Sequence, residues 1–150
     1  MRYRMTAAAN VRFMLLLLLG IAAGPAAAQN QTPANVGSPG LMWTPKDNDA
    51  DVDWNQASAY CANLRLGGNS DWRLPTIDEL QGIYDPSIPG DWHVKGNLQL
   101  SRTFSSYWSS SPGSASGEAW YFDFYGGSRL SDKLSFGGFK RAFCVRRSGG

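Results

Sequence analysis

The sequence predicts an α+β fold in which two early helices pack on a twisted antiparallel sheet with long loops. Apolar residues recur at helical spacing from Trp54 to Leu66, and a second helix start follows at Thr76. Two aromatic-rich segments that predict strands, Thr103–Ser109 and Glu118–Tyr125, lie in the last third of the chain. Helices grouped before strands, without the regular alternation of a parallel sheet, favour the α+β class.

The N-terminus is typical of a secretory signal peptide. Three arginines within the first 12 residues precede an apolar run, and Ala26–Ala28 form a small-residue cleavage site before Gln29. The apolar run is shorter than the roughly 20 residues of a membrane span. We therefore expect residues 1–28 to be removed, the protein to be periplasmic or secreted, and no membrane span to remain. A retained N-terminal anchor is the open alternative.

Removal of this leader changes the charge of the protein. The full chain has 14 Lys and Arg against 12 Asp and Glu, but residues 29–150 keep 11 basic residues and all 12 acidic ones. Nucleic-acid-binding domains usually carry a net basic surface, so we expect no nucleic-acid partner. After Ser128, however, six basic residues are accompanied by one acid, Asp132.

The chain divides into four predicted parts. The leader is followed by residues 29–39, a polar stretch interrupted by Pro and Gly that predicts a flexible arm. Residues 40–147 form one domain, because the 122 residues after the leader are enough for a single core. Residues 148–150 are a tail.

The first elements are predicted by capping signals. An apolar strand over Gly40–Thr44 ends at a proline, and an acidic loop leads to Asp53, which caps a helix over Trp54–Leu66 with Gln56 completing a capping box. The segment Trp72–Leu74 is expected to be extended because a proline follows it.

The second helix begins after Thr76, whose capping box is completed by Glu79, and it ends at Asp85 before a proline. A long loop over 87–102 follows. The expected strands of the sheet are Thr103–Ser109, Glu118–Tyr125, Ser128–Ser135 and Lys140–Arg147.

Two cysteines in an exported chain favour one disulfide between Cys61 and Cys144. A catalytic or metal-binding cysteine pair is the alternative, although neither residue has a histidine or a second cysteine at ligand spacing. Closing a loop of this length contributes about 4.5 kcal/mol in the chain-entropy model.

Four separated motifs occur in one order along the chain: Trp54-x-x-Ala57-x-x-Tyr60-Cys61-x-x-Leu64, Asp71-Trp72-Arg73-Leu74-Pro75-Thr76-x-x-Glu79-Leu80, Tyr107-Trp108-Ser109-Ser110, and Phe143-Cys144-Val145-Arg146. This combination resembles the Lcl C-terminal domain family, named for the last domain of a bacterial collagen-like adhesin. The resemblance implies a C-type-lectin-like fold, distantly similar to the formylglycine-generating enzyme superfamily. It also implies a disulfide from the first helix to the final strand.

The departures from these relatives limit what the resemblance implies. The chain lacks the extra catalytic cysteine of the oxidising enzymes, and it lacks the Glu-Pro-Asn, Gln-Pro-Asp and Trp-Asn-Asp triplets of calcium-dependent lectins. We therefore expect no catalytic residue. The expected function is recognition or adhesion through an extracellular or envelope glycan or a protein. An enzyme-related domain and a structural subunit of an envelope assembly are the alternatives.

The candidate ligand-binding residues lie in the last third of the chain. If the last two strands pair, their cations gather into a patch that suits an acidic polysaccharide; scattered, solvated charges are the alternative. Aromatic rings beside the Ser/Gly loop could stack on a sugar, although any of them could instead be core. The candidates are Arg129, Lys133, Lys140, Arg141, Trp108, Trp120 and Tyr121.

Calcium is the single cofactor that the sequence leaves open. Asp47, Asp49 and Asp51 alternate as in the start of an EF-hand loop. The later positions do not match, because Val52 replaces the turn glycine and Ser58 the bidentate glutamate. A solvated acidic loop is preferred, and we otherwise expect no cofactor. The lone His93 has no nucleophile motif around it and is expected to be a solvent-facing loop residue.

Overall fold

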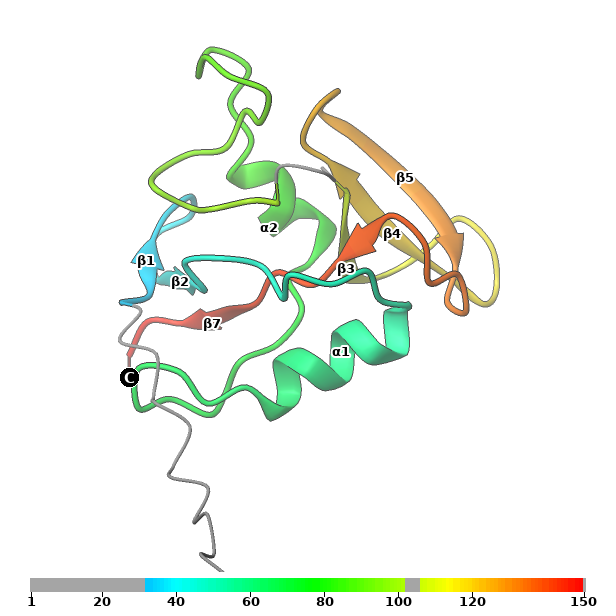
Figure 1. The fold of residues 1–150 in the computed structure, drawn as a ribbon, viewed down its shortest axis with the longest axis horizontal. Helices are drawn as coiled ribbons and strands as arrows, with labels where there is room; N and C mark the ends of the chain where they lie inside the picture. Colours follow the sequence, from blue (N-terminus) through cyan, green and yellow to red (C-terminus); the bar gives the residue numbers. More distant parts are fainter. Residues whose placement is uncertain (1–31, 102–105, 150) are drawn as a thin grey trace, which may run out of the picture.

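The computed structural model describes residues 32–101 and 106–149 and confirms the α+β class (Figure 1). The predicted leader lies outside the described residues. No helix within them is both long and apolar enough to span a membrane. In chain order, the elements formed by the described residues are β1 (Ala34–Asn35), β2 (Leu41–Trp43), α1 (Trp54–Asn63), α2 (Ile77–Gly82), β3 (Ser106–Pro112), β4 (Glu118–Asp123), β5 (Ser128–Lys133), β6 (Lys140–Arg141) and β7 (Val145–Arg147).

The strands form two sheets, whereas the sequence predicts one. Strands β1, β2 and β7 make a three-stranded antiparallel sheet, and the order β5-β4-β3-β6 makes a four-stranded sheet in which β6 runs parallel to β3. The prediction of one strand over Lys140–Arg147 is therefore wrong. Arg141 pairs with Tyr107 in the second sheet, whereas Val145 pairs with Trp43 in the first, so the chain changes sheets between them.

The predicted flexible arm is partly ordered. Ala34 pairs with Trp43 across β1 and β2, and the indole Nε1 of Trp43 donates a 3.1 Å hydrogen bond to the carbonyl of Val36. The domain therefore begins before Gly40, because a short strand of the arm completes the edge of the first sheet.

Both helices begin where the sequence predicts. The side chains of Asp53 and Thr76 each accept a hydrogen bond from the N3 backbone, and both capping boxes are complete. Helix α1 ends earlier than expected, because Leu64 is already extended at φ −64° and ψ 136°.

The four-stranded sheet lies between the two helices and contributes to two cores. Tyr107 and Phe122 belong to the cluster that contains Leu80 of α2, whereas the neighbouring Trp108 packs with Ala57 of α1. Successive side chains of a strand point to opposite faces, so β3 and β4 supply both clusters.

Candidate functional site

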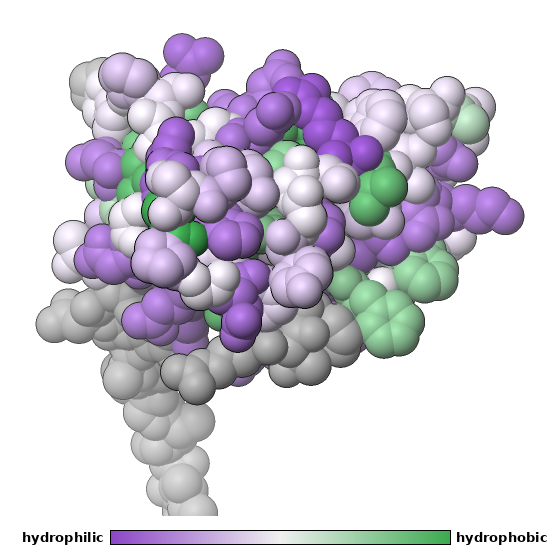
Figure 2. All heavy atoms as spheres, turned by 90° about the horizontal axis from the view of Figure 1, so that it is seen from above, coloured by the Kyte–Doolittle hydropathy of each residue, from purple (hydrophilic) through white to green (hydrophobic). Residues whose placement is uncertain are grey.

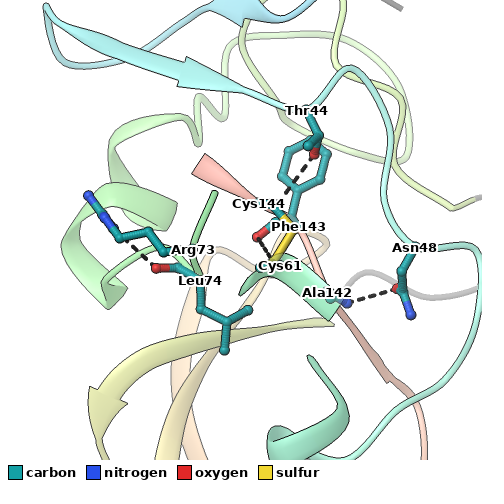
Figure 3. The surroundings of a disulfide bond; sticks show 8 residues. All are labelled: Thr44, Asn48, Cys61, Arg73, Leu74, Ala142, Phe143 and Cys144. Carbon is teal, nitrogen blue, oxygen red and sulfur yellow. Dashed lines mark hydrogen bonds between the residues drawn. A yellow bond between two sulfur atoms is a disulfide. The ribbon is translucent and has the colours of Figure 1, made fainter. Parts of the chain in front are cut away.

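The disulfide anchors the frame on which the candidate site is built. Cys61 on α1 and Cys144, which directly precedes β7, are both fully buried and joined by an S–S bond of 2.03 Å (Figure 3). The backbone N–H of Cys144 donates to the hydroxyl of Thr44 at 3.3 Å. The predicted disulfide is confirmed, and it ties the first helix to the chain just before the last strand.

The structure does not gather the predicted basic residues into one patch. Strands β5 and β6 occupy opposite edges of their sheet, so the pairing that the patch required is absent from the described residues. Lys140 is buried and reaches across the sheet, where its Nζ lies 2.8 Å from Asp132. The same ammonium lies 5.0, 4.5 and 4.1 Å from the ring centres of Trp108, Tyr121 and Phe136.

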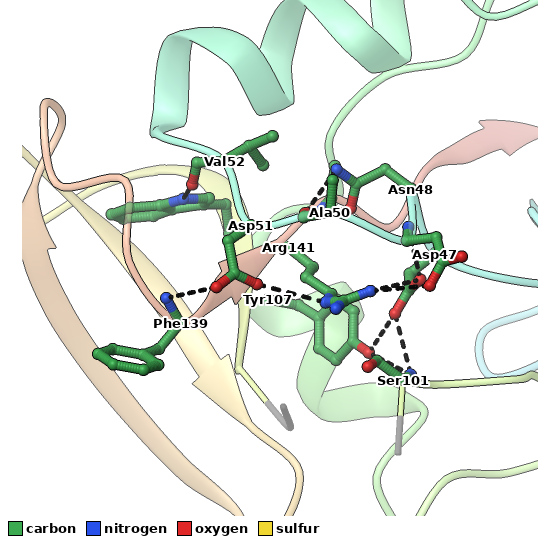
Figure 4. Close-up of polar contacts among 12 residues, drawn as sticks. Asp47, Asn48, Ala50, Asp51, Val52, Ser101, Tyr107, Phe139 and Arg141 are labelled. Atoms are coloured by element: carbon green, nitrogen blue, oxygen red, sulfur yellow. Dashed lines mark hydrogen bonds and ion pairs between the residues drawn. The ribbon is translucent and has the colours of Figure 1, made fainter. Parts of the chain in front are cut away.

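Arg141 is also buried and is surrounded by the acidic loop. Its guanidinium lies 3.6 Å from Asp47, 3.2 Å from Asp49 and 3.5 Å from Asp51 (Figure 4). The three carboxylates that suggested a calcium loop thus surround a cation from the protein itself. Within 32–101 and 106–149, no group of three or more His, Cys, Asp and Glu is arranged to hold a metal ion.

Asp47 is the buried member of this loop. Its Oδ2 accepts hydrogen bonds from the Tyr107 hydroxyl at 2.7 Å and from the Ser101 backbone N–H at 2.9 Å. Burial and the neighbouring carboxylate raise the pKa of Tyr107 far above its usual range, so the phenol stays protonated and donates. The network joins the acidic loop to β3, which is a structural use of residues that the sequence offered as metal ligands.

The remaining basic candidates lie at the surface. Arg129 forms an ion pair with Asp78 at 2.6 Å and donates a hydrogen bond to the side-chain amide oxygen of Gln81 at 2.5 Å. These contacts connect β5 to α2. Lys133 is exposed at the end of β5. The four predicted cations therefore occupy separate environments, three of them in ion pairs.

The predicted aromatic candidates point to different sides of the sheet. Trp108 is fully buried and donates its Nε1 hydrogen to the carbonyl of Val52 at 2.9 Å, so it presents no ring face to a ligand. Trp120 packs against the cluster beside α2, whereas Tyr121 packs against the cluster beside α1. Both are half-buried and do not form one platform.

A pocket of about 570 Å³ lies in the long loop before β3. Trp92 is one of the residues that line it, and the ring of Trp92 meets that of Tyr125 edge to face, with ring centres 6.4 Å apart. Tyr125 follows β4 and is 68% exposed. The carboxylate of Asp91 and the amide of Gln99 are both exposed. The lining residues are Gly90, Asp91, Trp92, Val94, Leu98, Gln99 and Leu100.

The surroundings of the pocket are held by backbone contacts. The N–H of Gln99 donates to the carbonyl of Pro45 at 2.8 Å, and that of Asp85 donates to the carbonyl of His93 at 2.9 Å. His93 is half-buried, in contrast to the expected solvent-facing residue. Its Nδ1 lies 2.7 Å from the carbonyl oxygen of Ile88, and its ring is perpendicular to that of Tyr84, with ring centres 5.9 Å apart.

Neither Trp92 nor Gln99 is among the site residues that the sequence predicts. A tryptophan beside an aspartate in a segment without periodicity is a usable signal, because loop aromatics have no helical or strand pattern that would bury them. The approach of Tyr125 to Trp92 depends on where the β4–β5 turn lies relative to the loop. Figure 1 shows the β4–β5 turn and the long loop before β3 at the same end of the molecule.

Comparison with known proteins identifies the domain. No curated protein matches the chain. A family model described as the Lcl C-terminal domain matches residues 37–146, which covers nearly all of the folded domain. The resemblance carried by the four separated motifs is thereby confirmed, and the chain belongs to the Lcl C-terminal domain family.

Proposed function

We propose that the protein is an exported, non-catalytic recognition module that binds a glycan in the Trp92 pocket. The observation that carries this proposal is the meeting of Trp92 with the exposed ring of Tyr125 beside a pocket lined by apolar and polar groups. Binding sites for small ligands are typically concave, with aromatic walls and a few polar groups that orient the ligand.

The chemistry of these residues suits a sugar. The apolar C–H face of a pyranose packs on an aromatic ring, and its hydroxyls need donors and acceptors at the rim. Asp91 accepts hydrogen bonds, and Gln99 both donates and accepts them. Figure 2 looks onto the end that carries this loop, where polar side chains dominate and apolar ones show between them.

The distribution of charge favours an uncharged or weakly charged glycan over the acidic polysaccharide expected from the sequence. Lys140 and Arg141 are buried against carboxylates, so a sulfate could reach them only by displacing Asp132 or the acidic loop. Breaking a buried ion pair is costly because one charge is left uncompensated. Recognition through aromatic rings avoids this cost.

A C-type-lectin-like fold is part of the proposal. Two observations support it: the disulfide from α1 to the segment before β7, and the sheet that brings the first strands beside the last one. Fold alone does not assign function, so the proposal depends on the pocket.

The proposal is tested by screening residues 29–150 on an array of neutral and acidic glycans, followed by titration of the best neutral ligand. Tyr125→Ala and Asp91→Asn should each weaken binding about tenfold, equivalent to about 1.4 kcal/mol. The control is Tyr60→Ala, which removes a partly exposed ring on α1 away from the pocket.

Added salt should leave neutral-glycan binding nearly unchanged. Binding confined to sulfated glycans, lost at high salt and in Lys133→Met but retained in Tyr125→Ala, would overturn the pocket and restore a charge-based site. No binding to any glycan would also overturn the proposal and direct the search to a protein ligand.

A further inference from the structure

Strand β5 is the open edge of the four-stranded sheet. All six of its residues are in register with β4, from Ser128 opposite Asp123 to Lys133 opposite Glu118. In the part of the chain that the structure describes, no strand pairs with its other side, and Figure 1 shows β5 on the outside of the molecule. An open edge of this kind presents unpaired backbone groups to another chain.

The hydrogen bonds near the end of β5 identify which residues point outward. The N–H of Leu134 donates toward β4, to the carbonyl of Gly117 at 3.0 Å, whereas the N–H of Lys133 donates to the carboxylate of the adjacent Asp132 at 2.8 Å. Neighbouring residues of a strand in an antiparallel ladder direct their backbone groups to opposite sides. Arg129 and Ser131 therefore direct their N–H and C=O groups away from β4.

The side chains leave this edge less protected than its composition suggests. Charged residues usually prevent edges from pairing. Here Arg129 is held by Asp78 of α2, and Asp132 is held by Lys140. Between them, Leu130 is 43% exposed. It lies directly opposite Tyr121 on β4 and has an open position on its other side.

We propose that β5 pairs antiparallel with β5 of a second copy of this chain, about a two-fold axis at Leu130. Most homodimers are symmetric in this way. Arg129 then pairs with Ser131 of the second copy, and Ser131 with its Arg129, so the outward backbone groups of both copies are satisfied. The two Leu130 side chains meet directly and extend the apolar contact that each makes beside Tyr121.

Charge selects this register over the next symmetric one. Pairing about Ser131 would place Arg129 opposite Lys133 of the second copy, and like charges directly opposite in a sheet are destabilising. Pairing about Leu130 places Ser128 opposite Asp132 and Arg129 opposite Ser131, with no like charges opposed. Phe136, which follows the strand, is also exposed.

Sedimentation of residues 29–150 over a wide concentration range tests the pairing. The expected result is a reversible monomer–dimer equilibrium. Leu130→Lys and Leu130→Glu should each weaken the dimer at least tenfold by placing like charges opposite each other. An equimolar mixture of the two variants should associate again as a heterodimer. Tyr60→Lys, the same type of change on α1, is the control and should leave the dimer unchanged.

A second experiment tests the register. Leu130→Cys should form a symmetric disulfide under mild oxidation, because a non-hydrogen-bonded pair brings its Cα atoms to about 4.5 Å, within the range that disulfides span. Ser131→Cys should cross-link much less. A monomer at every concentration, a dimer insensitive to Leu130→Lys, or preferential cross-linking of Ser131→Cys would each overturn the proposal. None of these outcomes depends on glycan binding.

Discussion

The ammonium of Lys140 lies 2.8 Å from the carboxylate of Asp132, although the two residues belong to opposite edge strands of one sheet. The lysine side chain crosses the face of the sheet over the rings of Trp108 and Tyr121. Burial raises the pKa of the Asp132 carboxyl, but the hydrogen bonds from Lys140 and from the backbone of Lys133, together with the charges of these two lysines, lower it more, so the pKa lies below its usual range. A residue that the sequence offered as a ligand-binding cation is instead part of the folded frame.

Lys140→Met should destabilise the domain by about 2–3 kcal/mol, because it removes the buried cation from its aromatic contacts and leaves Asp132 without its partner. The apolar stem is kept, so lost packing contributes little. Lys133→Met is the matched control on the exposed end of β5 and should change stability by less than about 0.5 kcal/mol. Equal urea midpoints for the two variants would show that the ion pair does not stabilise the fold.

Glu79 should make the free energy of unfolding depend on pH in the acid range. Burial raises the pKa of its carboxyl, but the hydrogen bonds from Arg73 and from the backbone of Thr76 together lower it more. A group whose folded-state pKa is lowered contributes stability above its unfolded pKa, about 4.3, and loses it as the pH falls through the folded value.

The loss should therefore occur below about pH 5, and Glu79→Gln should reduce it. Unfolding free energies measured by urea titration from neutral to acid pH check this. Asp78→Asn, on the same helix but exposed, should retain the contribution of Glu79. An unchanged acid slope in Glu79→Gln would mean that the Arg73 pair is not formed in solution.

The disulfide should contribute about 4–5 kcal/mol, because it closes a loop with a sequence separation of 83 residues. Mass analysis of the purified protein under non-reducing conditions should find Cys61 linked to Cys144, and the Cys61→Ala, Cys144→Ala double variant should unfold at much lower urea. Two free thiols in protein purified without a reducing agent would refute the linkage.

Asp47→Asn should cost about 2–3 kcal/mol, because the amide cannot replace the carboxylate toward both Tyr107 and Arg141. Asp49→Asn should cost less than about 0.5 kcal/mol, since its side chain is 85% exposed and Asn tolerates the positive φ of 56° found there.

Calcium should not raise the thermal midpoint of either variant or of the parent protein. A calcium-dependent rise that is lost in both variants would return the acidic loop to the role of a metal site.

Local chemistry was readable from the sequence. Asp53 and Thr76 predicted both helix starts, because a capping box involves residues only three positions apart. The extended segment before Pro75 followed from an equally local signal, and the disulfide followed from the limited number of cysteines. The family of the domain could be predicted for the same reason, because its motifs are short and occur in a fixed order along the chain.

The tertiary structure decided which cations and rings remain available to a ligand. Lys140 and Arg141 are adjacent in the chain, yet one is held by Asp132 and the other by the acidic loop. The ion pairs that the two residues form depend on the parallel pairing of β6 with β3 and on the change of sheets before Val145. The pattern of charges along the sequence predicts neither of these features. The meeting of Trp92 with Tyr125 likewise joins a loop to a distant turn. The sequence determined the capped helices, the cysteine link and the family, because neighbouring residues or short motifs specify them; the candidate site was decided by long-range packing, which brings together residues that no local pattern relates.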